Sequence, residues 1–453
     1  MNSADLFPDF SKGFNDKTDI FSRFDLFKKL ISICENTPEK NLVFALDDQW
    51  GEGKTSFVKM MKGQIEKDYS EKFNAIYFDA FENDYHSDPF ISISAEFYSL
   101  TSKPENNLKS FEKPFLSITK KVGASVLIAG LKAVINTTTA GLVSGDKIFD
   151  ATIEAAKSAS ENLTDSLEQY IEKKITTAAE EKADINSFRK TLSEMHVTSG
   201  KKTIFIVDEL DRARPDYSLD LLEKIKHLFS VEGVIFLLVM NRSQFEKCIE
   251  KRYGNIDSKT YLNKFINFYI TLPKTKQYEL TIDAPHNKTT IYKYMRSILK
   301  NGNIIQPDGI MHKGFSYLLG ISGCSLRECE RCISLINALK ETTERVSYID
   351  EYLYALTFVV FLKVHDPKLL EKFLEKSVDL RTLLTELNIY NSNSTRTDSD
   401  TRLLRVIEFH YLTPDKYAQE NTKNTYPGLF QFNDRPDNPF FFFNDKIKNF
   451  SLD

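Results

Sequence analysis

Two short segments of the chain carry residues whose types and spacing could do phosphoryl-transfer chemistry. The first follows the apolar run 42–46 and consists of Trp50, Gly51, Glu52, Gly53, Lys54, Thr55 and Ser56. The second is the apolar run 204–207, followed by Asp208 and Glu209. A buried strand that ends in a Gly-Lys-Thr turn and opens a helix is typical of a phosphate-binding loop. Because a second buried strand ending in Asp-Glu supplies a metal-binding carboxylate and a candidate base, the two segments together predict a nucleoside triphosphate site.

The first segment has what a phosphate tail requires. Several backbone N–H groups must point at one spot, next to a positive charge and a helix N-terminus. Gly51 and Gly53 carry no Cβ, so the backbone can bend and approach the ligand closely. We expect Lys54 to reach the β and γ phosphates and the Thr55 hydroxyl to bind Mg²⁺. The alternative interpretation is a glycine-rich turn before an ordinary helix.

One residue of this loop departs from the usual pattern. A glycine is expected five residues before Gly53, and the chain has Asp48 there. Asp tolerates unusual turn conformations, but its carboxylate then lies near an anionic ligand. Two outcomes stay open: the carboxylate weakens nucleotide binding, or it points outward.

The second segment places two carboxylates at the end of a buried strand, where ligands bind in open α/β sheets. We expect Asp208 to hold Mg²⁺ through water and Glu209 to polarise the attacking water. A solvated strand end or a helix cap is the alternative for this acidic pair. We prefer the site because both acids directly follow four apolar residues.

Asn241 follows the apolar run 234–240 and could orient the attacking water or sense the γ-phosphate, although a plain helix cap would look the same. The charge of the transition state usually needs a cationic side chain as well. The candidates, among which the sequence does not choose, are Arg212, Arg214, Arg252, Lys264 and Arg327.

Strand and helix patterns alternate around these motifs, which indicates an α/β domain. Most of the expected strands are near-continuous apolar runs, as in sheets covered by helices on both faces. The expected strands are 42–47, 74–79, 203–208, 234–240 and 267–272. The expected helices of this part are 23–35, one starting near 54, 89–100, 217–229 and 243–251. After Pro273 the pattern is mostly helical, including a buried core helix at 353–362.

A stretch of about 100 residues, 101–200, interrupts the sheet pattern and predicts a long helix over 146–195. Within it, 122–135 is the one candidate membrane segment, but a spanning helix needs roughly 20 apolar residues. A packed helical hairpin or a peripheral membrane contact through 122–145 is therefore preferred to a true span.

Composition adds limits rather than a function. Apolar residues make up 41% and charged residues 27%, as in ordinary globular proteins, and the net charge of −4 gives no sign of nucleic-acid binding. Without a basic start and an apolar stretch at the N-terminus, we expect a cytoplasmic protein, with membrane association as the alternative. Cys324, Cys329 and Cys332 are interpreted as buried small hydrophobes rather than a thiolate metal site, since no further Cys or His lies nearby in the sequence. The four Phe at 440–443 are expected to dock into the core, with partner binding as the minority interpretation.

The motifs resemble those of the KAP P-loop NTPases, named after a neuronal kinase-D-interacting scaffold and the plasmid phage-exclusion protein PifA. Ser325-Leu326-Arg327-Glu328 resembles the lid segment of that family, and the resemblance runs from about residue 15 to 340. The other matching segments are Leu46 to Phe57, Tyr77 to Asp84 with Asp88-Pro89, Asp208 to Arg212 with its continuation to Phe229, and Tyr261 to Ile266. Asp48 and Phe81, which stands where Trp is common, depart from the pattern.

The resemblance implies an α/β fold: a P-loop NTPase core of the additional-strand, catalytic-glutamate type, with a parallel sheet flanked by helices. It also implies a helical insertion between the two nucleotide motifs, which in many members enters the membrane. We expect a core of 1–100 and 201–275, an insertion of 101–200, a helical lid of 276–340 and a C-terminal helical region of 341–453. Taken together, the site residues we predict are Lys54, Glu209, Asn241 and Arg327 for catalysis, 50–56 for ATP, and Thr55 with Asp208 for Mg²⁺.

The leading functional hypothesis is an ATP-hydrolysing switch in bacterial anti-phage defence or signalling, acting on a protein partner or as a homo-oligomer. One alternative is a nucleotide-binding scaffold with little turnover, which Asp48 supports. A peripheral membrane protein acting through 122–145 is another. A nucleic-acid motor is weaker, because the chain lacks a basic groove with interleaved aromatic residues.

Overall fold

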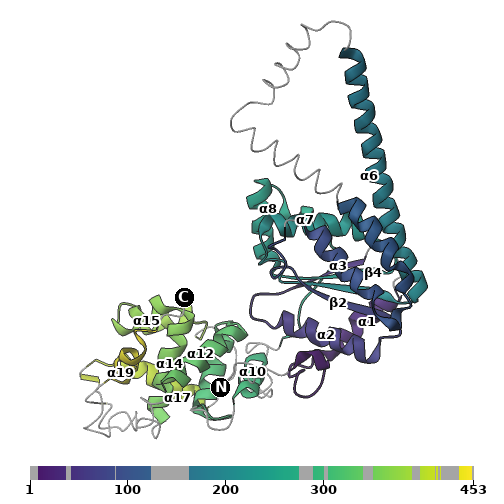
Figure 1. Cartoon of the computed structure of the whole chain (residues 1–453). Helices are drawn as coiled ribbons and strands as arrows, with labels where there is room; N and C mark the ends of the chain where they lie inside the picture. Colours follow the sequence, from purple (N-terminus) through teal and green to yellow (C-terminus); the bar gives the residue numbers. More distant parts are fainter. Residues whose placement is uncertain are drawn as a thin grey trace.

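The computed structural model describes residues 9–36, 42–86, 88–123, 163–274, 289–299, 305–339, 350–389, 398–413, 415–416, 419 and 438–450. Figure 1 shows an α/β core, in which a sheet lies between helices, and a group of helices formed by the chain after residue 289. The two sequence motifs lie in the α/β core, and the predicted lid segment lies in the helical group.

The sheet has five parallel strands in the order β2-β3-β4-β1-β5. They are β1 (Leu42–Asp47), β2 (Phe73–Asp79), β3 (Lys202–Asp208), β4 (Val234–Met240) and β5 (Phe268–Ile270). All five expected strands are confirmed. β4 lies between β1, which leads into the Gly-Lys-Thr turn, and β3, which ends at Asp208. The carboxyl ends of these three strands therefore meet at one edge of the sheet.

Each central strand is apolar throughout because both of its faces are covered. Phe44 and Leu46 enter one hydrophobic core, whereas Val43 and Ala45 enter another. Helices α1 (Phe24–Asn36) and α2 (Lys54–Asp68) contribute to the first core. Helices α3 (Pro89–Thr101) and α7 (Pro215–Lys224) contribute to the second core and lie across the sheet from α1 and α2 (Figure 1).

The α/β core contains several further helical elements. The segment 225–229, expected to continue the helix before it, is a π-helix, η5 (Ile225–Phe229). The other elements are η2 (Phe10–Lys12), η3 (Pro104–Asn106), η4 (Lys109–Phe111), α8 (Arg242–Tyr253) and α9 (Ser258–Leu262).

The insertion between β2 and β3 contains the long helix α6 (Leu163–Ser199), which extends away from the sheet in Figure 1. Its C-terminal part is anchored by Phe188, whose buried ring contacts Phe90 and Phe229. The expected long helix is confirmed from residue 163 onward. The candidate membrane segment 122–145 lies outside the described residues after Gly123. In the portions that the structure does describe, no helix combines the length and the apolar character needed to cross a membrane.

The chain after residue 289 forms a helical bundle with one hydrophobic core. Its centre is α14 (Asp350–His365), most of whose side chains are buried, so the predicted core helix at 353–362 is confirmed. The other helices are α10 (Thr290–Ile298), α11 (Ile310–Ile321), α12 (Leu326–Ala338), α15 (Pro367–Leu374), α16 (Leu380–Glu386), α17 (Asp398–His410) and α19 (Pro439–Ile447). Helices on both sides of residue 340 share this core, and the predicted domain limits stay predictions.

Two expectations about the bundle are confirmed by burial. Phe440 and Phe443 of α19 are fully buried in the bundle core, so the Phe run docks through these two rings, whereas Phe441 is 49% exposed. Cys329 and Cys332 are fully buried in the same core and behave as small hydrophobes. Cys324, by contrast, faces polar neighbours.

A buried histidine joins α19 to the bundle. His410 is 2% exposed, and its Nε2 lies 2.9 Å from the backbone oxygen of Phe373. The Asn438 Oδ1 accepts the N–H of Phe440, so the amide nitrogen of Asn438 donates to Nδ1 of His410 at 3.0 Å. The ring is therefore neutral, with its proton on Nε2. Burial lowers the pKa of His410 from 6.5 to about 4, even though the Phe373 carbonyl favours the charged ring.

We expect this histidine to make the chain less stable as the pH falls from 6.5 towards 4. In that interval the unfolded chain binds a proton that the folded chain does not, and the difference costs about 3 kcal/mol of unfolding free energy. The unfolding free energy, measured by urea unfolding at several pH values in this range, should fall less steeply with decreasing pH for His410→Gln than for wild type. His227→Gln, which changes an exposed histidine, is the control. The same pH dependence of the unfolding free energy in wild type and His410→Gln would contradict a lowered pKa at His410.

Candidate nucleotide site

The phosphate-binding loop connects β1 to α2, and side chains from other parts of the chain pack closely against its two glycines. Gly51 and Gly53 have φ of 83° and 81°, a region that glycine enters without strain. A Cβ at Gly51 would lie 3.0 Å from Cβ of Arg327, and a Cβ at Gly53 would lie 3.1 Å from Nη1 of Arg23. The two glycines therefore serve both the backbone conformation and the close approach of neighbouring side chains.

Lys54 is the first residue of α2, and its side chain turns back over the loop. Its Nζ donates to the backbone oxygens of Asp48 at 2.6 Å and Gln49 at 2.9 Å. Burial lowers the pKa of Lys54, while nearby carboxylates, Asp211 foremost, oppose that effect. The ammonium group is thus held above the loop by two neutral backbone oxygens, and a charged phosphate oxygen would be a stronger hydrogen-bond acceptor for it.

Asp208 is the last residue of β3 and is 1% exposed. Its Oδ2 accepts from the Tyr77 hydroxyl at 2.9 Å, and its Oδ1 accepts from the backbone N–H of Glu209 at 2.9 Å. Burial raises the pKa of Asp208, and hydrogen bonds from the hydroxyls of Thr55 and Tyr77 act against that rise. The predicted pair, Thr55 and Asp208, lies on one cavity wall.

Glu209 follows β3 with φ of 57°, a left-handed conformation that is uncommon for residues other than glycine. This turn directs its carboxylate towards the loop: Oε1 lies 3.5 Å from Oγ1 of Thr55, and Oε2 lies 2.6 Å from Nε of Arg212. Burial raises the pKa of Glu209, Arg212 lowers it, and Asp208 raises it further. A strained acid beside the predicted metal ligands is the arrangement expected of a general base.

The carboxylate of Asp48 is neutralised by a lysine that the sequence analysis missed. Nζ of Lys274, just after β5, lies 2.5 Å from Oδ1 of Asp48 and 3.2 Å from Oε2 of Glu52. Both acidic side chains are less than 10% exposed. Burial raises the pKa of Glu52 although Lys274 opposes it. Asp48 therefore carries its own counter-ion in place of a free charge.

Arg23 is a second cation that the sequence analysis missed. It is 1% exposed, and its guanidinium donates to the backbone oxygens of Glu52 at 3.1 Å and Gly53 at 3.4 Å. Burial lowers the pKa of Arg23 to about 10, while the carboxylates of Glu52, Asp48 and Asp19 oppose the shift. The side chain stays cationic at neutral pH and fixes the loop from the side of the N-terminal segment.

A cavity of about 580 Å³ opens where these groups meet. Its walls come from the N-terminal segment, the loop, the end of β3 and the bundle helices α10 and α12. The lining residues that argue for a ligand are Asp16, Thr18, Phe21, Arg23, Trp50, Gly51, Gly53, Lys54, Thr55, Ser56, Asp208, Glu209, Asp211, Arg212, Tyr294, Leu326, Arg327 and Glu330. A concave site with polar groups converging at one end suits a ligand that carries both a ring and a phosphate tail.

Of the five candidate cations, Arg212 and Arg327 line this cavity. Arg214 pairs with Asp84 and Arg252 with Asp216, while Lys264 lies over the ring of Tyr261. The structure thus brings two of the candidates to the loop and engages the other three elsewhere.

Other predicted site residues take different positions. Asn241 follows β4 and is the N-cap residue of α8, but its Oδ1 accepts from the Ser243 hydroxyl at 2.8 Å, and it does not line the cavity. The side chain of Glu52 faces Lys274 and not the cavity. Nε1 of Trp50 donates to Asp211, which joins the loop to the turn after β3.

Comparison with known proteins agrees with this arrangement. A model of the KAP family P-loop domain matches residues 27–283. No curated protein matches the chain. Among solved structures, the Aeropyrum pernix ORC2 protein in its ADP form is 12% identical, with 84% of this chain and 83% of that chain covered and a TM-score of 0.36. The Aeropyrum pernix ORC1 protein in complex with DNA is 13% identical, with 94% and 96% covered and a TM-score of 0.36. Similarity this low carries no functional argument.

The sheet order, the loop and the acidic strand end define a P-loop NTPase core, as predicted. Since the family model matches more than half of the sequence, the chain belongs to the KAP family of P-loop domains. The chain is therefore a nucleotide-binding protein of the NTPase class.

Proposed function

We propose that the chain hydrolyses ATP and works as a nucleotide-dependent switch. The observation that carries this proposal is the convergence of Lys54, Thr55, Asp208, Glu209 and Arg327 on one cavity. The first four are the groups that an in-line attack on a γ-phosphate needs, and Arg327 brings a cation from the lid.

Each group has a role that its geometry supports. The Lys54 ammonium would exchange its two backbone partners for phosphate oxygens. A hydroxyl and a buried carboxylate that line the same cavity are oxygen donors that suit Mg²⁺, so Thr55 and Asp208 would hold it. Mg²⁺ held there would neutralise negative charge on the phosphates. Glu209 would accept the proton of the attacking water, and Arg327, with Arg212, would stabilise the charge that develops.

The switch follows from the parts that enclose the site. The N-terminal segment through Phe21 and Arg23, and the bundle through Tyr294, Leu326 and Arg327, line the same cavity. A ligand that contacts both favours the arrangement that closes around it, and loss of the γ-phosphate removes part of that preference. ATP and ADP would therefore favour different arrangements of these segments, and a change in arrangement can alter a surface far from the nucleotide.

The role in the cell that we propose is a signalling or anti-phage switch acting on a protein partner or as a homo-oligomer. Its support is the resemblance of the quoted motifs to KAP P-loop NTPases. Cells that express wild type should resist a phage that infects cells expressing a variant unable to hydrolyse ATP. Equal plating of the phage on both would contradict the defence role and leave the ATPase proposal standing.

The ATPase proposal is tested by binding and phosphate release measured together. Trp50 is the single tryptophan of the chain and lines the cavity, so its fluorescence should report ATP binding directly. Wild type should bind ATP, and it should release phosphate from ATP only when Mg²⁺ is present. Lys54→Ala should bind at least tenfold more weakly and release no phosphate, because the loop then lacks its ammonium.

The matched control is Lys62→Ala, which removes a lysine of the same helix that pairs with Glu66 at the surface. It should behave as wild type. Wild type that binds ATP without ever releasing phosphate would instead favour the nucleotide-binding scaffold. Asp48, which was the support for that alternative, is paired with Lys274.

A further inference from the structure

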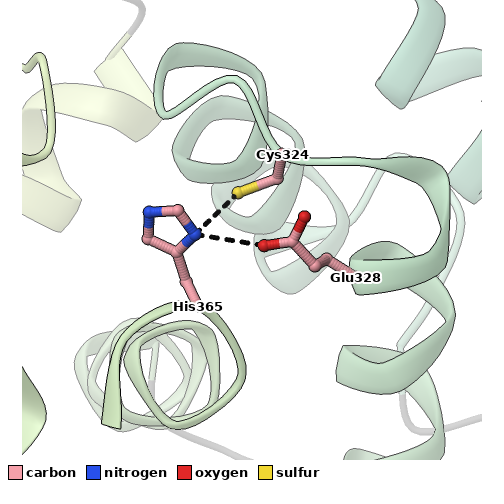
Figure 2. A group of neighbouring side chains, drawn as sticks. All are labelled: Cys324, Glu328 and His365. Carbon is pink, nitrogen blue, oxygen red and sulfur yellow. Dashed lines mark hydrogen bonds and ion pairs between the residues drawn. The ribbon is translucent and has the colours of Figure 1, made fainter. Parts of the chain in front are cut away.

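Three side chains outside the nucleotide cavity converge at the junction of two bundle helices (Figure 2). Cys324 precedes α12, Glu328 lies in the first turn of α12, and His365 is the last residue of α14. Nδ1 of His365 lies 3.3 Å from Sγ of Cys324 and 3.1 Å from Oε1 of Glu328. The three donor atoms all lie within 4.8 Å of one another. The sequence analysis found no further ligand near Cys324, and the fold supplies one in His365.

Two of the three groups, Glu328 and His365, are held in place by contacts with neighbouring residues. Oε2 of Glu328 accepts the N–H and the hydroxyl of Ser325 in a capping box, which directs Oε1 to His365. The ring of His365 stacks on Phe361 one turn earlier, with an interplanar angle of 16°. Partners that orient ligands from behind are a general property of metal sites.

The three groups can each offer an electron pair to a cation. Nδ1 of His365 lies 3.3 Å from Sγ of Cys324 and 3.1 Å from Oε1 of Glu328, so a thiolate, a neutral ring and a carboxylate would place three donor atoms side by side. Burial opposes ionisation of Glu328, yet hydrogen bonds from His365 and Ser325 lower its pKa to about 2, so Glu328 is a carboxylate at neutral pH. Burial, and then the charge of Glu328, raise the pKa of Cys324, so its thiol is no nucleophile as it stands.

We propose that Cys324, Glu328 and His365 bind a Zn²⁺ ion. Zinc takes sulfur, imidazole nitrogen and carboxylate oxygen at about 2.0–2.3 Å, and tetrahedral angles then give ligand-to-ligand edges of about 3.4–3.6 Å. The observed 3.3 and 3.1 Å need to widen by only a few tenths of an ångström. A soft thiolate with an imidazole excludes Mg²⁺ and Ca²⁺, which bind oxygen ligands.

Binding replaces protons by the metal. The thiol proton of Cys324 leaves to solvent, its sulfur binds as thiolate, and the lone pair of Nδ1 binds while Nε2 keeps the proton of the neutral ring. The side chains of Glu328 and His365 are 24% and 27% exposed, so a water can complete the fourth position. Three protein ligands and a water make an exchangeable site and not a closed structural one.

The ion would connect the start of α12 to the end of α14. Arg327, next to Glu328, lines the nucleotide cavity, so metal occupancy would fix the part of the lid that carries this arginine. This consequence rests on the proposed role of Arg327. Metal binding itself is therefore tested without nucleotide, and it can succeed or fail whatever the ATPase assays show.

The test is a Co²⁺ titration of the full chain after removal of metal by a chelator. Wild type should develop a thiolate-to-cobalt charge-transfer band that saturates at one equivalent and is displaced by one equivalent of Zn²⁺. Cobalt bound at Thr55 and Asp208 would have no thiolate and would give no such band. Cys324→Ser should lose the band, and Cys248→Ser, at a partly exposed cysteine away from the cluster, should keep it.

His365→Gln provides a second measurement that does not depend on the cysteine. It should keep the fold, shown by its circular dichroism, and weaken Zn²⁺ binding at least tenfold in a competition with a chromogenic chelator. Wild type without the band, a band that survives Cys324→Ser, or undiminished Zn²⁺ affinity in His365→Gln would each overturn the site. The three groups would then be a hydrogen-bonded contact between helices.

Discussion

Glu209→Gln should bind ATP within a few-fold of wild type and release phosphate about 10²–10⁴-fold more slowly. The amide has the shape of the carboxylate but cannot accept a proton from water. Oε2 of Glu209 already has a cation in Arg212 at 2.6 Å, and Oε1 points towards Thr55. The group is thus placed beside the predicted γ-phosphate site and does not contribute to the loop that would bind the phosphates.

The dependence of this rate on pH provides an independent check. Burial and the neighbouring acids raise the pKa of Glu209 above its ordinary value of 4.5, although Arg212 opposes them. Because the ionised form is the base, wild-type turnover should fall with decreasing pH at a midpoint above 4.5. Glu209→Gln should lack this acid limb. The measurement is phosphate release across pH at saturating ATP and Mg²⁺.

Two Glu or Asp variants make the result decisive. Glu223→Gln changes a carboxylate of α7 that accepts from the hydroxyls of Tyr253 and Tyr261, and it should leave turnover unchanged. Asp211→Asn changes an acid that lines the cavity but accepts from Trp50. Loss of turnover in Asp211→Asn with normal turnover in Glu209→Gln would show that the base was assigned to the wrong residue.

The elements of the core could be predicted because their information is local. β1 and β4 begin and end at the predicted residues, since each is an unbroken apolar run followed by a polar residue. β5 is shorter than expected, Phe268–Ile270 in place of 267–272, because it lies at the sheet edge and pairs with β1 alone. The π-helix Ile225–Phe229 was not predicted, because its apolar pattern also fits an α-helix.

Much of the site was also visible in the sequence, but the charges that support it were not. The loop and the Asp-Glu pair have characteristic residues at characteristic spacing. Lys274 and Arg23 have neither: one follows a short edge strand, and the other precedes an amphipathic helix. Only the fold brings Lys274 to Asp48 and Arg23 to the backbone of Gly53. Tertiary pairs of this kind have no local pattern by which a single sequence could reveal them.

Lys274→Met should be the most damaging single change away from the phosphate contacts. It leaves Asp48 and Glu52, both less than 10% exposed, as neighbouring buried acids without the lysine that contacts both, and Arg23 is then the nearby cation that remains. Removing one partner of a buried ion pair costs about 3–5 kcal/mol, and the partial exposure of Lys274 reduces this to about 2–4 kcal/mol. Part of the cost should appear as weaker ATP binding, because Asp48 begins the phosphate-binding loop and its backbone oxygen accepts from Nζ of Lys54.

A double-mutant cycle separates this pairing from a general loss of packing. Asp48→Asn alone should be mild, and Asp48→Asn with Lys274→Met should recover more than 1 kcal/mol of the stability and affinity lost in Lys274→Met, because it removes one of the two buried charges and their mutual repulsion. Urea unfolding and Trp50 fluorescence provide the two readouts. Lys72→Met, which breaks an exposed pair with Glu35, should cost less than about 1 kcal/mol. Strictly additive losses would mean that Lys274 acts through its methylene chain, and the question of how this loop tolerates Asp48 would then be open again.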